Sequence, residues 1–253
     1  MSAYDLLRVW EAGEDQHPLD RALTLLAAAC PELTWDELAA LSVGQRDARL
    51  LALRERTSGP RLNGSAECPQ CAQRLEFDVT VADLRAAADP DAGDEKQKLK
   101  QELKQELKQE LVTEGLALRF RLPDSRDLAA VLGCQDPAAA RGLLVQRCLL
   151  EASRDGAPVA GSELPAGAIT RLARRMAECD PQAEVLLDLR CPACEHAWQA
   201  LFDIVAFFWA ELAAQAKRLL REVHTLAQAY GWREADIVGM GARRRQFYLE
   251  MVS

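Results

Sequence analysis

The chain has 253 residues, of which 49% are hydrophobic and 28% are charged, and its formal net charge at pH 7 is -8. This composition is ordinary for a globular protein with enough apolar residues for a core, in one large domain or two modest ones. The acidic balance argues against a general binder of nucleic acid or of acidic membranes, since such binders need a basic surface.

The N-terminal stretch "MSAYDLLRVWEAGED" is acidic and lacks a continuous apolar segment, so we do not expect it to be a secretory signal. The most apolar run, 201–214, contains Asp203 and Glu211 and is too short to span a bilayer. We therefore expect a cytoplasmic protein that does not enter a membrane. In a reducing compartment, eight cysteines are not expected to form four disulfides, and clustered pairs are more typical of metal ligands.

Helical periodicity predicts an N-terminal helical region over residues 1–62. Apolar residues at three- and four-residue spacing indicate one helix that ends at Pro31. Thr34 is predicted to cap the next helix, with Glu37 at the capping-box position. A further helix is expected from about 44–56, before the turn-rich sequence "SGPRLNGS".

The repeat "KLKQELKQELKQELVTEG" lies within residues 94–115, which we predict to be a helical insertion. It places a leucine at every fourth position, and because a helix turns about 100° per residue, this stripe rotates around the helix. The segment 98–110 is then either a coiled-coil contact or a solvent-exposed extension between two strands. We prefer the extension, because a coiled coil needs at least three regular heptads.

Residues 116–183 are predicted to form a central block. It begins with the alternating strand "LALRFRLP" and continues in helices, one of them over 141–153. Residues 184–204 are predicted to hold a cysteine knuckle between the strands "EVLLDLR" and "WQALFDI". The remainder, 205–253, is predicted to be a C-terminal helical region whose final helix lies near 235–251.

Two Cys-Pro-x-Cys motifs are the most specific feature of the sequence. Cys68 and Cys71 lie in "ECPQC" within the first predicted knuckle and strand, 63–82, and Cys191 and Cys194 lie in "RCPAC". The proline fixes its own φ, and the tight turn directs both sulfurs into one space. Two such knuckles supply the four thiolates of a tetrahedral zinc site. Four protein ligands leave no position for water or substrate, so the zinc is expected to be structural.

Other interpretations of the knuckles remain open. His196, two residues past the second knuckle, could replace a sulfur, although we expect it to be a turn residue. The thiols could instead be free or form a disulfide. A thioredoxin-like redox site fits less well, because it needs one motif in a βαβ context.

Catalytic signatures are missing from the sequence. It contains no glycine-rich phosphate loop, no Gly-x-Ser-x-Gly turn and no His-Glu-x-x-His. We therefore predict no catalytic residues and a protein that is not an enzyme. A metal-dependent hydrolase would need an open metal position and a general base.

The C-terminal region holds a basic cluster, Arg243, Arg244 and Arg245, followed by Phe247 and Tyr248. Adjacent arginines fan over a wide arc of a helix, and aromatic residues commonly anchor interfaces. These five residues are the predicted partner-binding surface. The alternative is a solvated cationic end that interacts with the helix dipole.

The N-terminal and C-terminal helical regions also resemble each other in sequence. Four pairs of residues align: Leu38 with Ile237, Leu41 with Met240, Arg46 with Arg245, and Leu50 with Leu249. The alternative is chance, because amphipathic helices resemble one another.

The predicted fold class is mainly α with a small antiparallel β zinc-ribbon-like element, that is, α+β. Five segments carry a resemblance to a known family: the two knuckle segments and the stretches "LLRVWEAGEDQHPLDRALTLLAAACPE", "LRFRLPDSRDLAAV" and "LAQAYGWREADIVGMGARRRQFYLEM". In these segments the chain resembles the T-even-type phage baseplate protein family. The resemblance spans most of the chain except the lysine–glutamine–glutamate repeat.

The resemblance implies a non-enzymatic structural or assembly protein of the baseplate or hub of a contractile tail or related injection machine. Its partners would be other baseplate, hub or spike proteins, and it would either stay in the particle or act only during assembly. The alternative is a zinc-ribbon regulatory or nucleic-acid-binding protein, which should show a basic face near the knuckles. The knuckle flanks "ECPQCAQRLEFDV" and "ACEHAW" are not basic.

Overall fold

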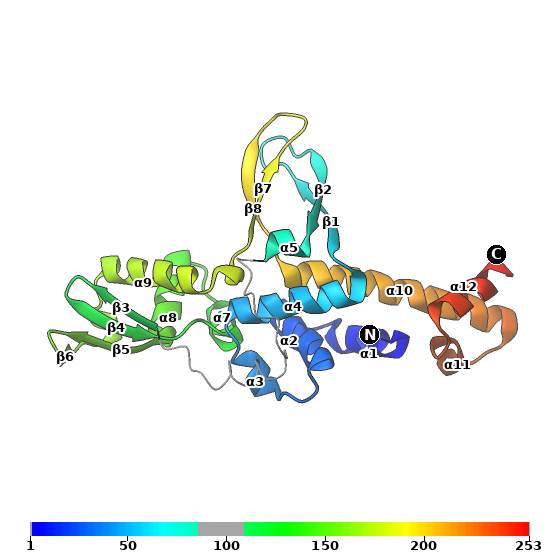
Figure 1. Cartoon of the computed structure of the whole chain (residues 1–253), viewed down its shortest axis with the longest axis horizontal. Coiled ribbons are helices and arrows are strands. Elements are labelled where there is room, and N and C mark those ends of the chain that lie inside the picture. The colour runs from blue at the N-terminus through cyan, green and yellow to red at the C-terminus, as the bar shows by residue number, and fades with distance from the viewer. Residues whose placement is uncertain (1, 86–108, 253) are drawn as a thin grey trace. The chain divides into compact units, whose positions relative to one another are not determined.

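A computed structural model describes residues 2–85 and 109–252. The chain divides into two compact units (Figure 1). The helical unit combines Met1–Pro31 with Ile204–Ser253, and the central unit is Glu32–Asp203. Most of the lysine–glutamine–glutamate repeat, 98–108, lies outside the described residues.

The helical unit is built around one long helix. Its elements are α1 (Ala3–Gly13), α2 (Pro18–Ala29), α10 (Ile204–Tyr230), α11 (Glu234–Val238) and α12 (Ala242–Glu250). Leu7 of α1, Leu219 and Leu226 of α10 and Ile237 of α11 are all buried in one core. The predicted helix before Pro31 is confirmed as α2, whereas the single helix predicted near 235–251 is wrong, because the chain breaks between α11 and α12.

The central unit mixes helices with three small antiparallel sheets among its described residues. Its helices are α3 (Trp35–Ala39), α4 (Val43–Ser58), α5 (Val81–Leu84), α7 (Ser125–Val131), α8 (Pro137–Cys148) and α9 (Ala166–Cys179), with the 3-10 turns η1 (Gly161–Glu163) and η2 (Pro181–Ala183). Its strands are β1 (Arg61–Glu67), β2 (Arg74–Thr80), β3 (Gln109–Thr113), β4 (Leu116–Phe120), β5 (Leu149–Arg154), β6 (Ala157–Pro158), β7 (Leu186–Arg190) and β8 (Ala197–Leu201). Helices predominate, which confirms the predicted fold class.

The largest sheet has the order β3-β4-β5-β6 and is covered by α9 (Figure 1). Leu116, Leu118 and Phe120 alternate along β4 and bury their side chains on one face. Leu172 and Met176 of α9, one helical turn apart, pack into the same core. The predicted strand "LALRFRLP" is therefore confirmed, and it is the centre of the core.

Two predicted helices fail where strand pairing overrides helical spacing. The helix predicted over 141–153 ends as α8 at Cys148, because the next residues form β5 and pair with β4. The helix predicted for 94–115 is wrong over Gln109–Thr113, which form β3. β3 pairs with β4 through a two-residue turn, Glu114 and Gly115, whose φ angles of 52° and 73° suit a tight hairpin.

The strand β1 was not predicted. It lies in the turn-rich sequence before the first knuckle and pairs along its whole length with β2. Of its side chains only Leu62 is fully buried, so the pattern of apolar residues is too sparse to indicate a strand. Gly64 faces the Phe77 ring across the pair, and a Cβ at that position would collide with the ring.

The predicted similarity between the two helical regions is present in the structure. The first helices, α3 and α11, begin and end at aligned positions, Trp35 with Glu234 and Ala39 with Val238, and the second helices begin at aligned positions, Val43 with Ala242, although α4 is longer than α12. The aligned arginines, Arg46 and Arg245, are both buried. Each pair is thus a five-residue helix, a short turn and a second helix that buries an arginine.

A buried carboxylate organises the loops next to the large sheet. Asp127 in the first turn of α7 is fully buried and accepts hydrogen bonds from Arg121 Nη2 at 2.9 Å and Arg147 Nε at 2.8 Å. The Asp124 backbone N–H also donates to it, at 3.1 Å. Burial alone would raise the pKa of Asp127, but Arg121 and the Asp124 amide hold that pKa well below its usual range.

We expect Asp127→Asn to lower the free energy of unfolding by about 1.5–3 kcal/mol at pH 7, because two partly exposed arginines would lose their shared carboxylate. Urea denaturation would measure this. Since the folded-state pKa is depressed, the contribution is present above about pH 4, the unfolded value, and is lost as pH falls toward the folded value.

The matched control is Glu178→Gln on α9, since Glu178 also bridges two arginines, Arg174 and Arg175, but is half exposed. It should cost at most about 1 kcal/mol. Equal losses for the two variants would contradict a structural role for the buried carboxylate.

Candidate metal centre

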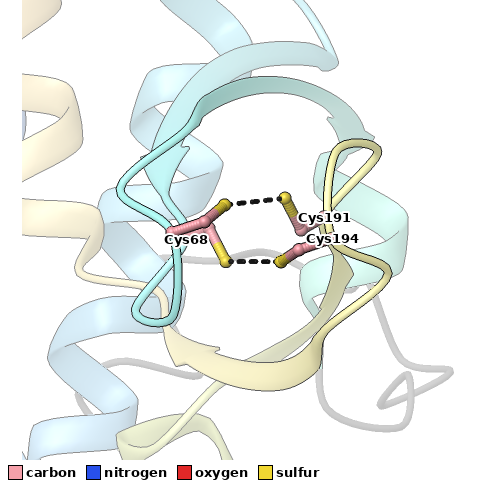
Figure 2. Close-up of side chains that lie close together, drawn as sticks. Cys68, Cys191 and Cys194 are labelled. Carbon is pink, nitrogen blue, oxygen red and sulfur yellow. Dashed lines mark hydrogen bonds between the residues drawn. The ribbon is translucent and has the colours of Figure 1, made fainter.

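Each Cys-Pro-x-Cys motif forms the turn of a two-stranded hairpin. Cys68 follows β1 and Cys71 precedes β2, while Cys191 follows β7 and Cys194 precedes β8. The two hairpins lie side by side, with their turns facing each other (Figures 1 and 2). The pairing of two knuckles far apart in sequence, which the motifs indicated, is therefore present in the structure.

The two turns have the same backbone hydrogen bonds. Cys68 N donates to the Gln73 carbonyl at 3.0 Å, and Cys191 N donates to the His196 carbonyl at 2.8 Å. The residue after each second cysteine, Ala72 or Glu195, has a φ of 58°. The repeated geometry means that each hairpin presents its two sulfurs in the same way.

The four sulfurs are spaced as a tetrahedral metal site requires. The Sγ atoms of Cys68 and Cys194 are 3.6 Å apart, as are those of Cys71 and Cys191, and all four lie within 4.8 Å of one another (Figure 2). A tetrahedral zinc ion with Zn–S bonds of about 2.3 Å sets its ligands about 3.8 Å apart. The four sulfurs are therefore close enough together to hold one metal ion.

The pKa values of the clustered thiols also favour the binding of a cation. Backbone N–H groups of Cys194 and Ala193 lower the pKa of Cys191 to about 7. The pKa of Cys194 is raised to about 12: the His196 amide favours its thiolate, but burial and the neighbouring thiols oppose a second negative charge. Four thiolates therefore need a positive ion among them, and metal binding would release protons.

His196 takes no part in the cluster. Among the described residues, the group that could hold a metal consists of the four cysteines. The His196 ring stacks on Trp198, with ring centroids 6.0 Å apart, and its carbonyl closes the second knuckle. With four protein ligands the coordination shell is closed, so a bound metal would hold the hairpins together and would have no open position for a substrate.

All eight cysteines lie within the described residues, and none of them forms a disulfide there. The two knuckles sit on antiparallel hairpins and not in a βαβ unit, so the setting differs from that of a thioredoxin-like site.

The predicted partner-binding residues of α12 do not form one surface. Arg245 is buried: its Nε donates to Glu222 Oε2 at 3.1 Å and it also donates to the Met240 carbonyl. Arg243 and Arg244 are exposed, and Phe247 is 58% exposed. We therefore treat Arg245 as a residue that holds the turn before α12.

Tyr248 belongs to an aromatic cluster with Tyr230 and Trp232. Its ring meets the Trp232 ring edge-on at 4.8 Å, and the Arg244 guanidinium lies 5.8 Å from its centroid. This cluster is half buried, with Tyr230 and Phe247 at its exposed edge. The sequence analysis grouped Tyr248 with Arg244 in the candidate partner surface but did not indicate Tyr230 and Trp232 as neighbours of Tyr248.

No helix among the described residues is long and apolar enough to cross a membrane. In comparisons with known proteins, the family described as T4 bacteriophage base plate protein matches residues 2–209 of the chain. This range includes both knuckles and excludes α11 and α12. No curated protein and no solved structure matches the chain significantly.

We expect Glu195→Val to weaken metal binding about tenfold, since a β-branched residue resists the left-handed backbone that the second knuckle needs. Glu195→Gly is the matched control, because it loses the same side chain but suits that backbone. Competition with a chromophoric chelator would measure the affinity. Equal weakening by both variants would show that the Glu195 side chain matters and its backbone does not.

Proposed function

The chain belongs to the T4 bacteriophage base plate protein family, and we propose that it is a structural or assembly protein of the baseplate or its central hub. The observation that carries this proposal is the family match, which covers residues 2–209 and so contains the whole central unit with both knuckles. In this proposal the protein works in a contractile tail or a related injection machine. Its partners are other baseplate, hub or spike proteins, and its role is not enzymatic.

The architecture supports a role in holding other proteins. The four cysteines form a closed ligand set, which is typical of a structural metal and not of a catalytic one. The candidate partner surface lies on the exposed side of α12, at Arg243, Arg244, Phe247 and Tyr248. We propose that this surface contacts another protein of the same machine.

We also propose that the metal is zinc. Tetrahedral sites of four thiolates are typical of zinc or of iron–sulfur centres, and paired Cys-Pro-x-Cys turns suit a single ion. Zinc would be held by Cys68, Cys71, Cys191 and Cys194, and its contribution would be structural: it would cross-link two hairpins whose turns face each other.

The purified protein should contain about one zinc ion per chain, and Cys68→Ser or Cys191→Ser should remove it and lower the melting temperature of the central unit. Elemental analysis and calorimetry would measure the two effects. Cys134→Ser is the control, because Cys134 lies outside the cluster, and it should keep the metal. Zinc-free protein purified under reducing conditions, or full occupancy in the cysteine variants, would contradict the proposal.

The baseplate proposal is tested by deleting the gene from a producing host. We expect sheath and tube proteins to accumulate while electron microscopy shows no complete baseplates, and expression of the gene in trans should restore them. Particles with normal baseplates in the deletion strain would refute the proposal. Mass spectrometry of purified particles against the lysate then decides whether the protein remains in the particle or leaves after assembly.

A further inference from the structure

The helical unit exposes its large apolar side chains at two places. Among the described residues of this unit, Tyr4, Tyr230, Phe247 and Met251 are the exposed ones. Tyr4 lies on α1, whereas the other three lie on α12 or next to it: Tyr230 ends α10, and its ring centroid is 5.8 Å from that of Tyr248. Single exposed apolar residues are common on protein surfaces, but a gathering of them marks a candidate interface.

The first place is a groove between α1 and α11 in the helical unit (Figure 1). It has a volume of about 450 Å³. The buried side chains Leu7 and Val238 line it together with Ala235 and Gly239, and the exposed ring of Tyr4 lines it as well. The lining is therefore mainly apolar, and the groove is large enough for a bulky side chain of another molecule.

The groove also carries unpaired negative charge. Glu11 of α1 and Glu234 of α11 line it, both are exposed, and neither forms an ion pair with a described residue. Arg8 lines it too, but it has a carboxylate nearby on its own helix: hydrogen bonds from Ser2 and, less strongly, the charge of Arg8 lower the pKa of Asp5. Residues 1–31 hold five carboxylates and two arginines, so this side of the unit is acidic.

The second place is the exposed side of α12. Arg243, Phe247 and Met251 are four residues apart and so lie in one stripe along the helix, and Phe247 and Met251 expose 58% and 63% of their surface. Arg243 and Arg244 are exposed, and neither pairs with a carboxylate of the described residues. With three arginines and one glutamate, α12 is basic in a protein whose net charge is -8.

We propose that α12 of one copy of the chain binds the groove between α1 and α11 of a second copy. Phe247 would enter the groove and contact its apolar lining, while Arg243 and Arg244 would face Glu11 and Glu234. The two surfaces are complementary, since one offers an apolar hollow beside unpaired carboxylates and the other an exposed aromatic ring beside unpaired arginines. The inference rests on the proposed partner surface of α12 and names its occupant.

The contact joins two different surfaces of the same chain, so it is a head-to-tail contact. Repeated contacts of this kind produce either a closed ring or an open chain of copies. One aromatic anchor and two exposed ion pairs make a small interface, so we expect weak association, with a Kd of about 10–100 µM.

A charge exchange tests the contact on the full-length protein. We expect Arg243→Glu with Arg244→Glu, and separately Glu11→Lys with Glu234→Lys, to raise the Kd at least about tenfold, because like charges would then face each other. The four side chains are exposed, so both variants should fold, as circular dichroism would show. An equimolar mixture of the two variants should associate as the wild type does, because opposite charges then meet in every contact. Sedimentation velocity at low ionic strength would measure the association.

The matched control is Glu14→Lys with Asp20→Lys. It changes the net charge by the same amount at exposed positions of the helical unit that do not line the groove. Asp20 lies in the first turn of α2 as Glu234 lies in the first turn of α11, so the loss of helix stabilisation is comparable. This variant should associate as the wild type does.

A photo-crosslink would locate the contact. The photoreactive residue p-benzoylphenylalanine at position 247, in a mixture of ¹⁴N- and ¹⁵N-labelled protein, should join two copies at residues within 4–11 or 234–239. Wild-type protein that is monomeric up to about 500 µM would overturn the proposal and leave the α12 surface to a different protein. Failure of the mixture to restore association, or crosslinks between copies at other segments, would also overturn it. These outcomes do not depend on the baseplate phenotype of the deletion strain, so the two proposals fail separately.

Discussion

The two knuckle hairpins of the central unit bring four thiol groups together while burying few apolar side chains of their own. An isolated two-stranded hairpin is marginally stable in water. In β1–β2 the buried apolar side chains are Leu62 and Leu75, and in β7–β8 the single one is Leu189. A metal ion held by the four sulfurs would cross-link hairpins whose short strands bury too few apolar side chains to form a core of their own.

The helix α4 relates the two hairpins to each other. β1 follows directly after its C-terminal end, so the first knuckle is carried by α4 itself. Its N-terminal end receives the turn that begins at Asp180, and the chain then runs through η2 into β7 and the second knuckle. Burial raises the pKa of Asp180, although the Gly44 amide and the Ser42 hydroxyl favour its charged form. The helix α4 therefore contacts or leads into the segments that precede both knuckles: β1 follows its C-terminal end, and the Asp180 turn before β7 binds its N-terminal end.

The parts predicted correctly from the sequence are those governed by local rules. Cys-Pro-x-Cys turns, the Thr34–Glu37 capping box and the alternation in β4 each depend on a few neighbouring residues. The errors arise where strand pairing decides: β3 is a strand because it lies against β4, β5 because it lies against β4 from the other side, and β1 because it lies against β2. The sequence does not distinguish Arg245 from Arg243 and Arg244 as a surface arginine. Its ion pair with Glu222 depends on how α12 packs against α10.

The cysteine pairs that meet are separated by 126 and 120 residues along the chain. At about 5–20 residues per second on the ribosome, the first knuckle emerges roughly 6–25 s before its partner. The helical unit waits longer, because α2 ends at Ala29 and α10 begins only at Ile204. Neither unit can close until most of the chain has been made, so the nascent protein carries an unpaired cysteine knuckle and unpaired amphipathic helices for a large part of its synthesis.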